Sequence, residues 1–186
     1  MDRARRLGAA SLLAAAAAVY ALDRLTKLWA EATLVDRPVD VIPGVLTLRF
    51  TTNSGGAFGI GRSTPWVFVT ATLVVSALIL ATSFRHRAGR TAVALGLVLG
   101  GALGNLTDRA VRGPGFSGRV VDFIDLQVWP VFNLADTAIV VGAVLLAFSS
   151  VADGRAGDDG RDDGREPGER GRAEGSDVAG PRRDVA

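Results

Sequence analysis

Apolar residues gather in four long segments over the first 151 positions, with polar stretches between them. The segments are residues 7–29, 65–83, 91–107 and 131–151. A predominantly apolar run of about 20 residues is long enough to cross the hydrocarbon core of a bilayer as a helix. The pattern therefore predicts an all-α membrane protein with four transmembrane helices, in one domain that covers residues 1–151.

The polar stretch between the first two segments contains an alternating pattern. Leu46, Leu48 and Phe50 fall on one side of it, and Thr47 and Arg49 fall on the other. A period of two residues is typical of a β-strand with one covered face. We expect a small extracytoplasmic β-cradle over about residues 39–60.

The end of the chain has a different composition from the rest. Residues 152–186 consist largely of Gly, Asp, Arg and Glu, with almost no large apolar side chain. Such a segment cannot bury enough apolar surface to fold. We expect residues 152–186 to form a disordered, charged cytoplasmic tail.

Basic residues indicate the orientation in the membrane. They are dense in residues 1–6 and 85–90, which the positive-inside rule places in the cytoplasm. Four crossings then place both termini in the cytoplasm, in a multi-pass membrane protein. Trp29, Trp66 and Trp129 fall at the opposite, outer ends of the predicted helices, as in an aromatic belt. A cleavable signal peptide is an alternative for the first segment, but its helical pattern continues to Trp29.

Composition limits the chemistry that the chain can perform. It has no cysteine, and its one histidine, His86, lies in a basic loop far from the polar motifs. A thiol nucleophile, a serine–histidine triad and a histidine-based zinc site therefore lack their central residue. The net charge of +2 comes without a basic stripe bearing aromatics, so we expect no nucleic-acid partner. We expect carboxylate chemistry that requires no metal and no cofactor.

Three polar motifs stand at or between the ends of the last two apolar segments. They read G-N-L-T-D-R (104–109), V-V-D-F-I-D (120–125) and F-N-L-A-D (132–136). Charged residues this close to a bilayer are costly and are usually functional. We interpret the motifs as an active site at the outer face of the membrane that the helices cross, with Asp122 and Asp136 as the residues that carry out its chemistry. Helix capping or an interfacial salt bridge could account for any one of these residues alone.

Two earlier motifs, D-R-L-T-K (23–27) and N-S-G-G-A-F (53–58), complete a pattern that resembles lipoprotein signal peptidase, or signal peptidase II. This family consists of bacterial membrane aspartyl peptidases. The resemblance covers about residues 7–151. It implies cleavage of prolipoproteins just before a diacylglyceryl-modified cysteine, and inhibition by globomycin.

The resemblance also implies roles for individual residues. Asp122 and Asp136 are implied to be the catalytic pair. Substrate binding or ordering of the site is implied for Asn53, Asn105, Asp108, Arg109 and Asn133, with Asp23 and Lys27 as supporting residues. Two departures from the family pattern are Gly56, where alanine is more common, and a longer flexible insert at residues 112–118.

Two other classes of protein remain to be weighed. Intramembrane carboxylates also serve small transporters and proton channels, but those place acids at the bilayer midplane. A non-catalytic assembly helper would use the small-residue face formed by Gly96, Gly100 and Gly104. For the peptidase we expect a prolipoprotein substrate and membrane lipid as partners, and action as a monomer.

Overall fold

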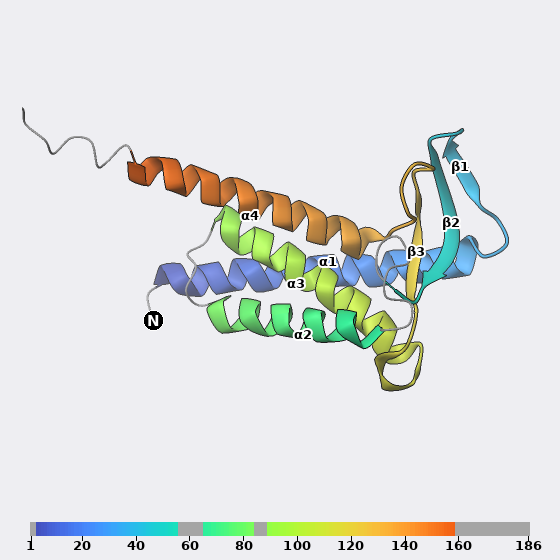
Figure 1. Cartoon of the computed structure of the whole chain (residues 1–186), viewed down its shortest axis with the longest axis horizontal. Helices are drawn as coiled ribbons and strands as arrows, with labels where there is room; N and C mark the ends of the chain where they lie inside the picture. Colours follow the sequence, from blue (N-terminus) through green and yellow to red (C-terminus); the bar gives the residue numbers. More distant parts are fainter. Residues whose placement is uncertain (1–2, 56–64, 84–88, 159–186) are drawn as a thin grey trace, which may run out of the picture. The chain divides into compact units, whose positions relative to one another are not determined.

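The computed structural model describes residues 3–55, 65–83 and 89–158, and these form four α-helices, a 3₁₀ turn and a three-stranded sheet (Figure 1). The elements in chain order are α1 (Arg3–Thr33), β1 (Val39–Ile42), β2 (Leu46–Asn53), α2 (Pro65–Thr82), α3 (Arg90–Val111), η3 (Pro114–Phe116), β3 (Val120–Asp125) and α4 (Leu134–Asp158). The four predicted apolar segments are confirmed as helices. Gly56, the rest of the predicted cradle loop and residues 159–186 of the predicted tail lie outside the described residues.

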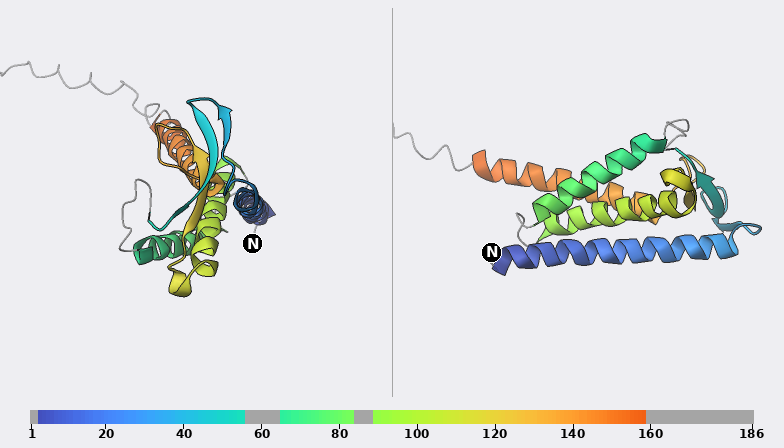
Figure 2. Two further views of the ribbon diagram at one scale, coloured as in Figure 1. Left: turned by 90° about the vertical axis from the view of Figure 1, so that its right-hand side faces the viewer. Right: turned by 90° about the horizontal axis from the view of Figure 1, so that it is seen from below.

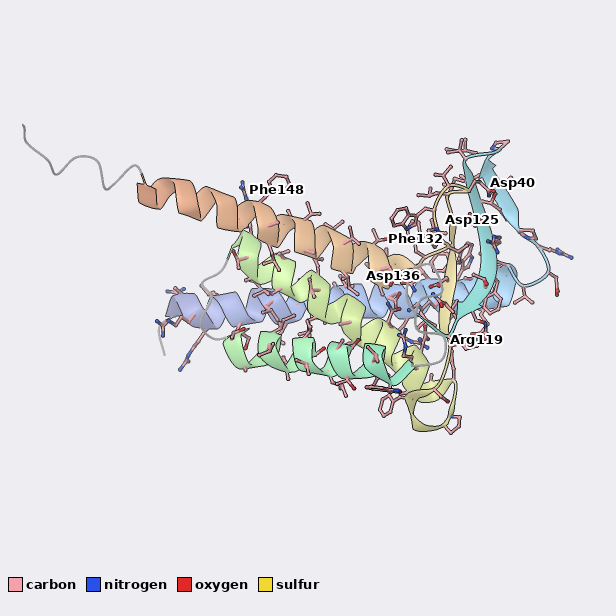
Figure 3. The ribbon with its side chains drawn as sticks, viewed as in Figure 1. Asp40, Arg119, Asp125, Phe132, Asp136 and Phe148 are labelled. Carbon is pink, nitrogen blue, oxygen red and sulfur yellow. The ribbon has the colours of Figure 1, made fainter. Side chains whose placement is uncertain are left out.

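Two of the helices meet the length and composition of a membrane span. These are α1 and α3, while α2 and α4 contain the shorter apolar stretches Val69–Thr82 and Leu134–Ser149. Large apolar side chains are exposed on the outer surface of the helices, among them Leu25, Leu78 and Phe148. Figure 3 shows Phe148 pointing away from the other helices.

Glycines allow α1 and α3 to approach each other closely. A Cβ atom at Gly96 would lie 2.4 Å from the backbone oxygen of Leu12, and one at Gly100 would lie 2.5 Å from that of Ala16. Both α3 glycines therefore require the absence of a side chain. The two helices lie side by side in the views of Figure 2, and Leu12 and Leu99 form part of the core between them.

The opposite face of α3 packs against α4 in the same way. A Cβ at Gly101 would lie 2.4 Å from the backbone oxygen of Ala135, and one at Gly142 would lie 2.7 Å from that of Ala94. The start of α4 is thus held against the C-terminal half of α3. This contact determines where the first turn of α4 presents its side chains.

The sheet has the strand order β1-β2-β3, and both pairings are antiparallel. The small β-structure predicted within residues 39–60 is confirmed by β1 and β2. Residues 120–125 form a third strand, β3, which the sequence pattern did not predict and in which Asp122 lies opposite Thr51. Val120, Val121 and Phe123 are all buried, so the strand is covered on both faces and lacks the alternation that marked β2.

The sheet is fixed to the C-terminal end of α1. Ala30 and Leu34 of α1 form a small core with Phe123 of β3, and Trp29 contacts the Phe123 ring edge-on at a centroid distance of 6.4 Å. Within residues 3–151, the sheet lies beside the C-terminal end of α1 and the N-terminal end of α4 (Figure 1). The polar motifs of distant segments therefore meet at one end of the helices.

Two local predictions differ from the structure. The insert at residues 112–118, predicted to be flexible, contains the η3 turn, in which the Ser117 hydroxyl donates to the Pro114 carbonyl at 2.7 Å. The backbone N–H of Gly118 donates to the carbonyl of Arg109 at 3.1 Å, which closes the insert onto α3. Helix α4 continues to Asp158, past the predicted end at residue 151, because no proline interrupts helix propagation there.

Candidate active site

The first turn of α4 is closed by a capping box. Asn133 precedes the helix, and its Oδ1 accepts the backbone N–H of Asp136 at 2.9 Å. In return, Oδ2 of Asp136 accepts the backbone N–H of Asn133 at 3.4 Å. This reciprocal pair satisfies two backbone donors at the helix N-terminus. The helix capping that the sequence allowed for these residues is therefore present. It fixes the Asp136 carboxylate at the end of α4 that faces the sheet (Figure 3).

The amide of Asn133 also connects this helix end to the sheet. Its Nδ2 donates to Oδ1 of Asp122 at 2.7 Å, and the Asn133 side chain is fully buried. Asp122 is itself 3% exposed. Asn133 thus contacts both predicted catalytic carboxylates, that of Asp122 through its side-chain amide and that of Asp136 through its backbone N–H.

A second amide, that of Asn105 on α3, contacts Asp136 from the other side. Its Nδ2 donates to Oδ1 of Asp136 at 2.8 Å. Its Oδ1 accepts from Nζ of Lys27 at 2.8 Å and from Nδ2 of Asn133 at 3.2 Å. Asp136 therefore accepts hydrogen bonds from two N–H groups, one on each carboxylate oxygen.

Behind Asn105 lies a buried cluster of charges on α1 and α3. Lys27 is fully buried and pairs with Oδ2 of Asp23 at 2.8 Å and Oδ2 of Asp108 at 3.1 Å. Arg24 and Arg112 also pair with Asp108. Because charges are stable away from water only when paired and hydrogen-bonded, this cluster is a cooperative unit.

Asp23 and Asp108 serve this cluster rather than the space around Asp122. Oδ1 of Asp23 accepts the backbone N–H of Ala135 at 3.0 Å, and Oδ2 of Asp108 accepts that of Val121 at 3.3 Å. Each carboxylate therefore anchors the residue next to one member of the predicted pair. A Cβ at Gly104 would lie 2.3 Å from Oδ2 of Asp23, so only glycine fits beside it.

Arg109 lies at the edge of the site and is 7% exposed. Its Nη2 donates to the carbonyl of Gly55 at 3.2 Å, and its Nη1 donates to the carbonyl of Asn105 at 3.3 Å. The guanidinium also interacts electrostatically with Asp122 and Asp136. It thereby connects the end of β2 to the carboxylate pair and supplies a positive charge close to it.

A cavity of about 460 Å³ opens beside these groups. Five of the predicted site residues line one part of it, namely Asn53, Asn105, Arg109, Asp122 and Asp136. The other walls are largely apolar and come from α2, α3, α4 and the segment before α4, including Val75, Val98, Ile139, Trp129 and Phe132. The cavity therefore has a polar part at the carboxylate pair and an apolar part between the helices. Asp23, Lys27 and Asp108 do not line it.

Two aspartates of β3 experience opposite environments. Burial, and then the neighbouring charge of Asp136, raise the pKa of Asp122 to about 7, although hydrogen bonds from Asn133 and Asn53 oppose the shift. The side chain of Arg49 holds the pKa of Asp125 below its usual range. Asp122 is therefore mostly protonated only below about pH 7, whereas Asp125 is ionised in that range.

Sequence reasoning missed several residues of the site. Arg24, Arg112 and Glu31 were not singled out, although Arg112 pairs with Glu31 through two hydrogen bonds of 2.9 Å each. The spacing of four between Asp108 and Arg112 on one helix face was the available signal. Within the parts of the chain that the structure describes, no three His, Cys, Asp or Glu side chains form a group that could hold a metal ion.

Comparison with known proteins agrees with this geometry. Residues 15–152 match the sequence model of the family "Signal peptidase (SPase) II". The lipoprotein signal peptidase of Syntrophomonas wolfei subsp. wolfei is 43% identical over 139 residues, which cover 74% of this chain and 90% of that protein. That of Rhodococcus jostii is 45% identical over 143 residues, covering 73% of this chain and 69% of that protein.

A solved structure described as a bacterial membrane enzyme has the same fold. It superposes with a TM-score of 0.68 at 27% sequence identity, and the match covers 84% of this chain and 94% of that one. The matched family range, residues 15–152, contains every residue of the cavity wall and of the charge cluster behind it. This chain therefore belongs to the signal peptidase II family of aspartic proteases.

Proposed function

We propose that the protein is a membrane aspartyl endopeptidase that removes signal peptides from diacylglyceryl-modified prolipoproteins, cutting just before the lipid-modified cysteine. Membership of the family supports the type of reaction. One observation carries the assignment of the site. Asp122 and Asp136, from different elements, are joined through Asn133 at the polar part of a cavity with apolar walls.

The two carboxylates have different roles in the proposed reaction. Asp136, ionised and held by Asn105 and Asn133, takes a proton from a water molecule whose oxygen attacks the scissile carbonyl carbon. Asp122, protonated near neutral pH, gives its proton to the carbonyl oxygen. As the C–N bond breaks, Asp136 passes its proton to the leaving amine and Asp122 regains one from the hydroxyl of the intermediate.

The apolar walls give a reason for the lipid requirement. Val75, Val98 and Ile139 line the cavity on three different helices, beside the carboxylate pair. Acyl chains of the modified cysteine would bury apolar surface against these walls. The peptide bond would then lie at the polar part of the cavity, where water can reach it.

We further propose that all four helices cross the bacterial cytoplasmic membrane, with both termini in the cytoplasm and the sheet outside. The exposed apolar side chains of the helices support this arrangement. Trp29, Trp66 and Trp129, all exposed, belong to the ends of segments next to the sheet and suit an interfacial belt. We also propose that the enzyme acts as a monomer, since the described residues of one chain include both carboxylates and the two asparagines that contact them.

Single cysteines test the orientation cleanly, because the chain has no cysteine of its own. Val41→Cys on the sheet and Arg5→Cys near the N-terminus occupy exposed positions at opposite ends of α1. In intact spheroplasts, an impermeant maleimide is expected to label position 41 and to label position 5 only after permeabilisation. Labelling of position 5 alone before permeabilisation would contradict the orientation.

Neutralising either carboxylate is expected to stop catalysis. Asp122→Asn and Asp136→Asn should each retain less than about 1% of the parental turnover, because proton transfer by a positioned group contributes at least about 100-fold. Asparagine is nearly isosteric, so both variants should still insert and accumulate. The measurement is a gel-shift assay on a diacylglyceryl-modified prolipoprotein.

Asp125→Asn is the matched control for that experiment. It lies on the same strand, but its carboxylate pairs with Arg49 and does not line the cavity. Turnover by this variant should stay close to that of the parent. Near-parental cleavage by Asp122→Asn or by Asp136→Asn would remove that residue from the mechanism.

The raised pKa of Asp122 predicts the alkaline side of the pH profile. Asp122 must hold a proton to polarise the carbonyl, and its pKa is about 7, so turnover should fall as the pH rises through about 7. The profile of kcat against pH, measured from about pH 5 to 9 with saturating substrate in micelles, tests this. A turnover that continues to rise to pH 9 would show that a protonated Asp122 is not required.

A further inference from the structure

We propose that Lys27 is a positioning residue that holds the Asn105 amide in the one orientation whose N–H group donates to the Asp136 carboxylate. The inference rests on the function proposed above. Lys27 does not line the cavity, and its hydrogen bond toward the reacting groups is made to Asn105, while its charge also acts on Asp122.

The orientation follows from the chemistry of the two side chains. Nζ of Lys27 lies 2.8 Å from Oδ1 of Asn105. An ammonium group only donates hydrogen bonds, so the amide must turn its oxygen toward Lys27. The amide nitrogen then faces Asp136, to which it donates at 2.8 Å.

This orientation matters because Asp136 can be either ionised or protonated. An N–H group pointing at its Oδ1 stabilises the ionised form. With the amide reversed, the Asn105 oxygen would face that carboxyl, which would then need a proton to form a hydrogen bond. Lys27 thus keeps an N–H group of Asn105 directed at Asp136, whereas burial and the charge of Asp136 raise the pKa of Asp122 against the opposing charge of Lys27.

Asn133 makes a second contact that favours the same orientation of the Asn105 amide. Its Nδ2 group, which carries two N–H donors, lies 3.2 Å from Oδ1 of Asn105 and 2.7 Å from Oδ1 of Asp122. The Lys27 contact is both shorter and charge-assisted, which makes it the stronger constraint on the amide.

Other charges around Asp136 must be considered in any test that uses pH. Asp122 on β3 and Arg109 on α3 interact with it directly, and among the described residues α2 lends the cavity no charged group. In the cluster behind Asn105, three cations face three carboxylates, namely Lys27, Arg24 and Arg112 with Asp23, Asp108 and Glu31. Loss of any one cation unbalances the cluster, but only Lys27 contacts Asn105.

This difference provides a matched control. Lys27→Met keeps the length of the side chain and removes the donor, while Arg24→Gln removes a cation of the same cluster that pairs with Asp108 and does not contact Asn105. For each variant, kcat, KM and their pH profiles would be measured on the diacylglyceryl-modified substrate. Thermal unfolding in micelles would report the loss of stability separately.

For Lys27→Met we expect kcat at neutral pH to fall by about 100-fold, the scale of general acid–base catalysis, with KM changed by less than about threefold. The acidic limb of kcat should move up by about one pH unit, because Asp136 loses a donor that favours its ionised form. Arg24→Gln should lower thermal stability and leave the acidic limb in place. Lys27→Arg, which is also a pure donor, should restore the limb to its parental pH.

Lys27→Met leaves two buried carboxylates without their lysine, so the single variant can fail to accumulate. The double variant Lys27→Met/Asp23→Asn removes one charge of each sign and is expected to show the same shift of the acidic limb. The proposal would be overturned if the acidic limb of the kcat profile lay at the same pH in the double variant and in the Arg24→Gln control. A parent enzyme that does not cleave the substrate would instead refute the proposed function.

Discussion

The site depends on one buried ammonium group. Lys27 is fully buried and holds Asp23, Asp108 and Asn105 around it. Through the first two it anchors the backbone of Ala135 at the start of α4 and of Val121 in β3, and those residues adjoin Asp136 and Asp122. Removing one partner of a buried ion pair costs about 3–5 kcal/mol, so the helices and the sheet cannot easily move apart. Placement of the carboxylate pair therefore depends on this buried charge together with the close packing of α4 against α3.

Close backbone packing makes the ion cluster possible. Gly104 leaves room for the Asp23 carboxylate, while Gly96 and Gly100 bring α1 against α3. In a bilayer there is little hydrophobic drive between helices, so small residues and interhelical hydrogen bonds must provide the association. The glycines on one face of α3 thus allow the close helix packing on which the site is built. The assembly-helper hypothesis had assigned the same small-residue face a packing role in a non-catalytic protein.

The sequence predicted the helices well because long apolar runs have few alternatives. It also predicted the gathering of Asn53, Asn105, Asp122, Asn133 and Asp136, since ordered motifs at helix ends must meet when the helices pack. It did not predict β3, whose residues are buried on both faces and show no alternation. Nor did it separate Asp108 from the cavity residues, because one helix face carries Asn105, Asp108 and Arg109. Which of these faces a cavity and which faces a charge cluster depends on the tertiary packing of α1.

The central claim is that the carboxylate pair holds one proton, on Asp122, below about pH 7. Infrared difference spectroscopy measures this directly, since a protonated carboxyl group has a carbonyl stretch that a carboxylate lacks. Comparing the parent enzyme with Asp122→Asn at pH 6, below the Asp122 pKa of about 7, should reveal one protonated-carboxyl band that the variant has lost. The same comparison with Asp125→Asn should reveal none, because the Asp125 carboxylate is ionised beside Arg49. Identical spectra for the parent and Asp122→Asn in that region would contradict the account.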